Sequence, residues 1–204
     1  MAQENRPTLS RRSFVAGAVV TAASSWTFPA AYAQSAGPIN FRVTGTADPT
    51  LIFVHGFACA LDDWDPQVNV LSPRFRCVAL DLPGHGASAK PATVSIAAMG
   101  TAVKEVKERL APRSAILVGH SMGCRVIVEA MLQSPSNVAG LVFVDGSILG
   151  GDPETGVKRA QDAVGRGVDA LTARLFNDMF VENSDPKLRE RLIAARTGSS
   201  ALRL

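Results

Sequence analysis

Residues Ala115 to Gly123 carry the sequence AILVGHSMG, in which a wholly apolar run is followed at once by the pattern G-x-S-x-G. The apolar run predicts a buried strand, and an apolar stripe at helical spacing after it predicts a helix over 122–134. Only glycine fits at the flanks of so tight a strand-to-helix turn, which lifts the Ser121 hydroxyl above the sheet. We therefore expect a nucleophile elbow at Ser121.

Further apolar runs alternate with helical patterns on both sides of this stretch. The predicted strands are Ile39–Val43, Leu51–Val54, Cys77–Leu80, Ala115–Val118 and Leu141–Val144, and the other predicted helices are 61–72 and 94–110. Strands this continuously apolar, separated by helices, predict an α/β fold with a doubly wound, mostly parallel sheet covered on both faces. After Asp145 the pattern indicates helices only, one of which starts at Asp185-Pro186 with the aspartate as N-cap.

Residues 1–33 differ in pattern from the rest of the chain. The segment Ser10 to Val15 (SRRSFV) resembles a twin-arginine export signal, a weakly apolar stretch follows, and Ala31-Tyr32-Ala33 is typical of a cleavage site. The apolar stretch is too short and too polar for a stable membrane span. We therefore expect a signal peptide at 1–33 that the twin-arginine export machinery recognises, and a periplasmic or secreted location in a bacterium. The mature chain would begin at Gln34, with a core over 34–150 and a helical cap segment over 151–204.

Charge and cysteine content exclude several classes of function. The chain has 204 residues, 21 of them basic and 18 acidic. Since residues 1–33 hold three of the arginines and one glutamate, the mature chain would carry a net charge of about +1, with no basic stripe that indicates nucleic acid or a membrane surface. Cys59, Cys77 and Cys124 are too widely spaced to indicate a zinc site or a disulfide framework. We expect three buried thiols, with a single bridge as the alternative.

Three motifs follow three of the predicted strands in a fixed order. They are His55-Gly56-Phe57 (HGF), Asp81 to Ser88 (DLPGHGAS) and Gly119 to Gly123 (GHSMG). A G-x-S-x-G alone is a weak signal, but three motifs in this order, each at the carboxyl end of a strand, are a strong one. In these motifs the chain resembles the α/β-hydrolase superfamily over about residues 38–200. The resemblance implies a serine hydrolase that transfers acyl groups from small carboxylic esters or related molecules, without a metal or other cofactor.

The resemblance also implies roles for individual residues. Ser121 matches the nucleophile that forms the acyl-enzyme, and the N–H groups of Phe57 and Met122 match the two donors of the oxyanion hole. Asp145 stands at the end of a predicted strand, where some members of the superfamily hold the acid of the catalytic triad. The alternative, that Asp145 is only a turn aspartate before Gly146, has at least as much support.

No histidine follows Ser121, although family order places the triad histidine after the nucleophile. Of the three histidines, His55 belongs to the oxyanion loop, His85 to the loop after an earlier strand and His120 to the buried side of the elbow, so none is a good base. Without an imidazole the Ser121 hydroxyl is a poor nucleophile. The apolar strand that ends at Val144 also lacks a later strand to pair with. We therefore expect an incomplete, impaired α/β-hydrolase whose base is a histidine beyond this sequence, oriented by an aspartate.

Other interpretations have less support. Residues 84–89 match the G-x-G-x-x-A fingerprint of dinucleotide-binding proteins, but Lys90-Pro91 follows where that fingerprint needs a helix. A metal hydrolase would need ligand pairs that the sequence lacks. The main alternative is a non-catalytic binding protein that keeps the hydrolase pocket, and a test of covalent chemistry at Ser121 separates the two. Three cap residues suggest an apolar acyl or alcohol site, although helix residues at that spacing more often belong to a core: Phe176, Met179 and Phe180.

Overall fold

The computed structural model describes residues 38–90, 94–146 and 167–196. The predicted signal peptide at 1–33 and the first part of the predicted cap lie outside these residues. Export and cleavage therefore remain predictions.

A five-stranded sheet forms the centre of the described core, in the order β1-β3-β2-β4-β5. The strands are β1 (Phe41–Thr44), β2 (Thr50–Val54), β3 (Arg76–Leu80), β4 (Ala115–His120) and β5 (Val138–Val144). Neighbouring strands from β3 to β5 run parallel, and β1 pairs antiparallel with β3. The predicted mostly parallel α/β sheet is confirmed, and each predicted strand is present with bounds shifted by up to three residues.

The helices also follow the predicted pattern, with one difference. They are η2 (Leu61–Trp64), α1 (Asp65–Leu71), α2 (Ile96–Leu110) and α3 (Met122–Gln133). The helix predicted at 61–72 is in fact a 3-10 turn followed by a short α-helix that has a proline in its first turn. A proline has no N–H to donate and fits the first turn of a helix, which is why the α-helix begins there.

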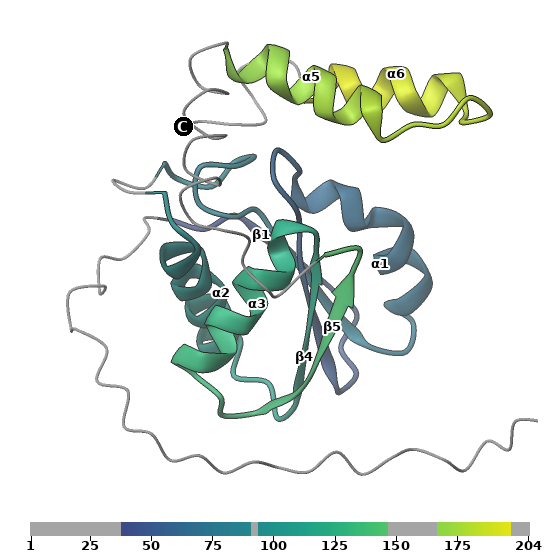
Figure 1. Ribbon diagram of the computed structural model, residues 1–204. Coiled ribbons are helices and arrows are strands. Elements are labelled where there is room, and N and C mark those ends of the chain that lie inside the picture. The colour runs from purple at the N-terminus through teal and green to yellow at the C-terminus, as the bar shows by residue number, and fades with distance from the viewer. Residues whose placement is uncertain (1–37, 91–93, 147–166, 197–204) are drawn as a thin grey trace, which may run out of the picture. The chain divides into compact units, whose positions relative to one another are not determined.

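Helices cover both faces of the sheet, as Figure 1 shows for α2 and α3 on one face and α1 on the other. The α2 and α3 side chains Val103, Val106, Val126 and Ile127 pack on the face of β2 and β3 that carries Ile52 and Leu80. The η2 and α1 side chains Leu61, Trp64 and Val68 pack on the other face, which carries Leu51, Phe53 and Ala79. Apolar side chains therefore alternate into two cores, which is the reason that these strands are apolar along their whole length.

Strand β5 is an edge of the described sheet. It pairs with β4 on one side only, and its residues Val142, Phe143 and Val144 are about two-fifths exposed. A strand with this composition is typical of a sheet interior rather than an edge. The described part of the sheet therefore leaves apolar surface next to the elbow uncovered.

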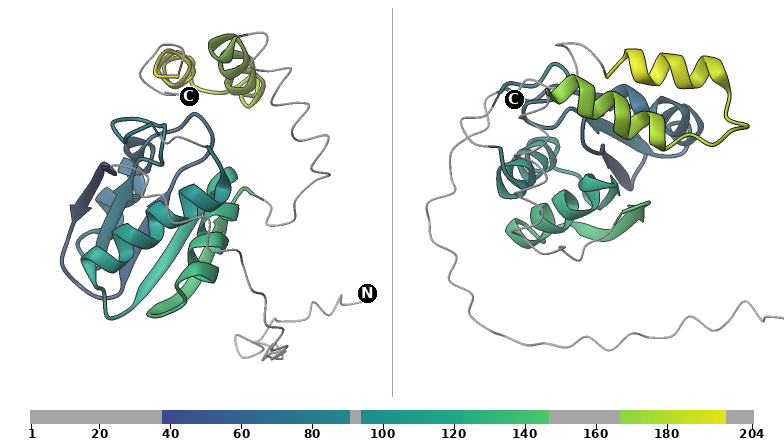
Figure 2. Two further views of the ribbon diagram at one scale, coloured as in Figure 1. Left: turned by 90° about the vertical axis from the view of Figure 1, so that its left-hand side faces the viewer. Right: turned by 45° about the horizontal axis from the view of Figure 1, so that its top comes forward.

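Two further helices, α5 (Val168–Asp178) and α6 (Pro186–Ala194), lie side by side, as Figure 2 shows. The side chain of Asp185 accepts the N–H of Lys187, so the predicted N-cap of α6 is confirmed. Both helices fall within the range predicted for the cap. Residue Arg196, directly after α6, contacts the core through the side chains described below.

Candidate active site

Ser121 stands at the sharp turn between β4 and α3. Its backbone φ is +52°, in the left-handed region that costs a non-glycine residue about 1–3 kcal/mol and that is common at functional sites. The two glycines of the motif allow the turn to close. A Cβ on Gly119 would lie 2.5 Å from the carbonyl oxygen of Gly123, and a Cβ on Gly123 would meet the carbonyl oxygen of Val54. The surrounding structure therefore holds Ser121 in a strained conformation, as the G-x-S-x-G pattern indicates.

The loop after β2, residues 55–60, passes directly beside Ser121. A Cβ on Gly56 would lie only 3.1 Å from the Cβ of Ser121. Phe57 follows Gly56 in this loop, and Met122 is the first residue of α3, where a backbone N–H has no acceptor within the helix. The two residues expected to supply oxyanion donors therefore belong to segments that meet at Ser121.

His55 and His85 are buried and tied to the backbone. His55 Nε2 accepts the Leu82 N–H at 3.0 Å, so the ring proton is on Nδ1, which donates to the Gly56 carbonyl at 2.7 Å. Burial, and secondarily the neighbouring His85, lower the pKa of His55 to about 4. Burial also lowers the pKa of His85, whose Nδ1 lies 3.1 Å from the Pro83 carbonyl oxygen. Burial thus disfavours the imidazolium that a general base must become.

His120 differs from its predicted position on the buried side of the elbow. Its side chain is only half-buried, lines a cavity, and stands edge-on to Trp64 with ring centroids 6.4 Å apart. His120 follows Val118 by two residues and points to the face of the sheet on which η2 and α1 pack, but the open cavity on that side leaves it partly exposed instead of fully buried as predicted. Asp145 is exposed with a φ of +44°, and among the described residues no hydrogen-bond partner of its carboxylate is present.

Asp81 explains much of the DLPGHGAS motif in structural terms. Its buried carboxylate accepts hydrogen bonds from the N–H groups of Leu61 and Ala87, at 2.8 and 3.0 Å, and from the side-chain amide of Asn40 at 2.8 Å. The motif therefore ties the end of β3 to η2 and to the segment before β1. Residues 81–90 form turns rather than the start of a helix, which argues against the dinucleotide fingerprint at 84–89.

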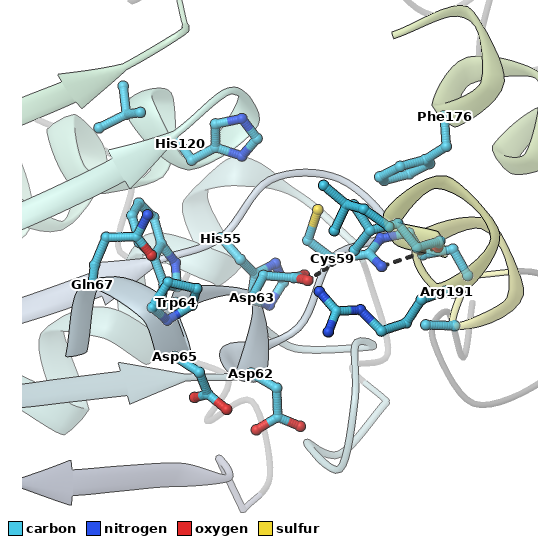
Figure 3. Close-up of a pocket in the computed structure, with 16 residues that line it drawn as sticks. His55, Cys59, Asp62, Asp63, Trp64, Asp65, Gln67, His120, Phe176 and Arg191 are labelled. Carbon is cyan, nitrogen blue, oxygen red and sulfur yellow. Dashed lines mark hydrogen bonds and ion pairs between the residues drawn. The ribbon is translucent and has the colours of Figure 1, made fainter. Parts of the chain in front are cut away.

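An open cavity of about 620 Å³ lies beside the elbow, lined by residues of η2, α1, the ends of β4 and β5, and the two cap helices (Figure 3). The lining includes His120, which precedes Ser121, and Cys59, which is two residues after Phe57. Ser121 and Phe57 themselves do not line the cavity. Of the three cap residues predicted to form an apolar site, only Phe176 lines the cavity, and Met179 is 66 % exposed. Phe180 is half-buried elsewhere.

Asp63 and Arg196 form an ion pair that the sequence did not indicate. The two residues are 133 positions apart, and Figure 3 marks their contact by a dashed line at Asp63. Arg196 is 6 % exposed, which is rare for an arginine that is not paired. An aspartate and an arginine so far apart in the sequence do not predict an ion pair, because most Asp and Arg side chains are solvated at the surface.

All three cysteines are free and buried, as predicted. Burial, and secondarily the charge of Asp63, raise the pKa of the Cys59 thiol to about 11, so this sulfur is neutral near pH 7. The described residues contain no group of three or more His, Cys, Asp or Glu side chains that could hold a metal ion. Within the same residues, no helix is long and apolar enough to cross a bilayer.

Comparison with known proteins agrees with the fold. The family model described as "alpha/beta hydrolase fold" matches residues 49–202. The chain belongs to the α/β-hydrolase family. The crystal structure of a hydrolase from Pseudomonas aeruginosa superposes with a TM-score of 0.69 at 26% identity, over 78% of this chain and 63% of that one.

Two similar α/β-hydrolase relatives are pimeloyl-[acyl-carrier protein] methyl ester esterases. The protein of Nitrosomonas europaea is 39% identical over 106 residues, which is 52% of this chain and 40% of that protein. The protein of Methylococcus capsulatus is 32% identical over 152 residues, which is 74% of this chain and 55% of that protein. This chain therefore spans less than two thirds of the length of these relatives.

Proposed function

We propose that this chain acts on carboxylic esters by acyl transfer to Ser121. The strained backbone of Ser121 at the elbow, with Gly56 packed against its Cβ, carries the proposal. Ser121 Oγ attacks the ester carbonyl carbon and gives its proton to a base, and the carbonyl oxygen becomes an oxyanion between the N–H groups of Phe57 and Met122. The alcohol then leaves with a proton, and water hydrolyses the acyl-enzyme. Relatives named as methyl ester esterases support an ester as the substrate class.

None of the three histidines in these 204 residues is well placed to take the proton of Ser121. His55 and His85 are buried with lowered pKa values, and His120 lines a neighbouring cavity whose lining does not include Ser121. Loss of a triad member costs up to about a millionfold in turnover, while the oxyanion hole and binding keep about a thousandfold over water. We therefore propose that the 204-residue chain turns over esters slowly. The lack of a well-placed base also favours the second candidate function, a binding protein that keeps the hydrolase fold but does not catalyse the reaction.

Free imidazole distinguishes these two functions, because it supplies the missing base from solution. Hydrolysis of p-nitrophenyl acetate is measured at increasing imidazole concentration for the wild type and for Ser121→Ala, which serves to subtract catalysis by imidazole itself. An enzyme gives a difference between the two proteins that grows with imidazole. Identical rates at every concentration would leave only the binding function.

Asp145 remains the proposed acid that orients an imidazole near Ser121. The variant Asp145→Asn should then lower the imidazole-dependent rate severalfold while the rate without imidazole stays the same. If Asp145→Asn and the wild type have equal rates in the presence of imidazole, Asp145 serves only to form the turn after β5.

We also propose that residues 1–33 direct the protein to the bacterial periplasm or cell exterior through the twin-arginine machinery. The support is the sequence pattern alone: the paired arginines Arg11 and Arg12, and the small residues before Gln34.

A further inference from the structure

The loop at residues 55–60, which carries the Phe57 N–H, is not held in place by its own backbone preference. Ala58 has a φ of +56°, a left-handed conformation that costs a residue with a Cβ about 1–2 kcal/mol. Such a conformation persists only where the surrounding structure fixes it. The contacts that fix this loop therefore also determine where the Phe57 N–H points.

One set of contacts comes from helix α5. Phe176 of α5 is buried against Ala58 and Cys59, and Phe57 and Ile193 border the same apolar cluster. Figure 3 shows Phe176 facing the cavity from the cap helices, with Cys59 on the side of the core. Through this cluster, the cap covers the loop directly at the strained residue.

A second set of contacts comes from Arg196, directly after α6. Its guanidinium lies over the Phe176 ring, 4.7 Å from the centroid, and its Nη1 donates to the Leu192 carbonyl at 3.0 Å. Its Nη2 pairs with one carboxylate oxygen of Asp63, whose other oxygen accepts the N–H of Ala60 at 2.9 Å. Arg196 thus acts on the loop at two points, on Ala58 through Phe176 and on Ala60 through Asp63.

We propose that Arg196 is a positioning residue that holds the oxyanion loop, through Asp63 and Phe176, in the conformation that directs the Phe57 N–H at Ser121. The inference rests on the proposed function, since it assigns the Phe57 N–H to the oxyanion hole. A buried guanidinium suits this task because its planar face stacks on an aromatic ring while its edge binds a carboxylate. Lysine can do only part of this, as a point charge.

The test uses phenylboronic acid, whose adduct imitates the tetrahedral intermediate. Ser121 Oγ adds to the trigonal boron, the Oγ proton passes to the buffer, and the tetrahedral boronate that forms places an oxygen at the oxyanion position. The supply of a base is the same in the wild type and in the Arg196, Asp63 and Arg191 variants, so differences in adduct affinity between these proteins report on the oxyanion position. Titration followed by ¹¹B NMR distinguishes the tetrahedral adduct from free reagent, and Ser121→Ala shows whether the adduct forms at this serine.

The 204-residue wild type is compared with Arg196→Ala, Arg196→Lys and Asp63→Asn, and Arg191→Ala is the matched control. Arg191 lines the same cavity from α6, but its side chain is exposed. Removing one oxyanion donor costs about a hundredfold in rate or more, so a displaced donor should weaken the adduct at least about tenfold in Arg196→Ala and Asp63→Asn. Arg196→Lys should recover part of the loss, and Arg191→Ala should bind as the wild type does.

Hydrogen exchange of the same proteins tests the positioning independently of the boronate. Amides at 56–61 should exchange faster in Arg196→Ala and Asp63→Asn than in Arg191→Ala, while amides of α2 and α3 keep their wild-type rates. If the wild type forms no adduct at Ser121, the proposed function fails and the exchange data alone decide the role of Arg196. If Arg196→Ala matches Arg191→Ala in adduct affinity and in loop exchange, the positioning role is refuted.

Discussion

Acidification should destabilise this fold through His55, which is held neutral in the folded state. Its side chain is 1 % exposed and its two ring nitrogens are engaged by Leu82 and Gly56. Burial is the main cause that lowers its pKa from 6.5 to about 4. Between these two values the unfolded chain binds a proton at His55 and the folded chain does not. Stability is therefore unaffected by His55 above pH 6.5 and falls as the pH drops from there toward 4.

The size of the effect follows from the same pKa shift. A decrease from 6.5 to about 4 corresponds to about 3 kcal/mol in full, of which about 2 kcal/mol is lost by pH 5. His85, whose pKa is also lowered by burial, acts in the same direction. A loss of this size is a large part of the 5–15 kcal/mol that stabilises a typical domain.

Urea unfolding at pH 8, 7, 6 and 5, followed by far-UV circular dichroism, measures the effect. The matched variant His55→Gln keeps an acceptor for the Leu82 N–H but does not titrate, so it should be less stable at pH 8 and should lose about 2 kcal/mol less than the wild type on going to pH 5. The reasoning is refuted if the two proteins lose the same stability over this range, or if the wild type loses none.

Three further predictions concern other parts of the chain. Asp81→Ala leaves three N–H donors without their acceptor and should lower the free energy of unfolding by about 3 kcal/mol or more in urea, against a smaller loss for Asp81→Asn. Lys107→Met removes the ammonium that caps the segment after α3 through the Ser134 and Ser136 carbonyls and should cost about 2 kcal/mol, whereas Lys90→Met, at an exposed site, should cost under about 0.5 kcal/mol. Replacing the twin arginines of residues 11–12 by lysines should leave uncleaved precursor in the cytoplasm, and normal release of the mature form would argue against twin-arginine export.

The sequence predicts the central strands of the sheet well because β2 and β3 are buried on both faces. Leu51–Val54 and Cys77–Leu80 are apolar at every position, which no solvent-facing strand tolerates. The elbow is predictable for a related reason, since Gly119 and Gly123 are required by backbone contacts that any such turn makes. The structure places Ser121 in strained backbone beside the loop of Phe57, but their chemical roles are still proposals.

Long-range side-chain contacts could not be predicted. The pairing of Asp63 with Arg196 depends on where a loop and the end of a cap helix meet, and no local pattern encodes that meeting point. The partial exposure of His120 depends on the cavity beside it, which no local pattern in the sequence predicts. The direction of β1 was also open, because a four-residue strand carries no sign of parallel or antiparallel pairing.

Covalent labelling of Ser121 is the most direct test of the proposed active site. A fluorophosphonate transfers its phosphonyl group to an activated serine hydroxyl and releases fluoride, and peptide mapping by mass spectrometry identifies the modified residue. We predict slow modification at Ser121 alone, faster in the presence of imidazole and absent in Ser121→Ala. Rapid labelling without imidazole would show that the chain already holds a base. No label at Ser121 even with imidazole, or equal labelling of Ser121→Ala, would contradict the assignment of Ser121 as the nucleophile.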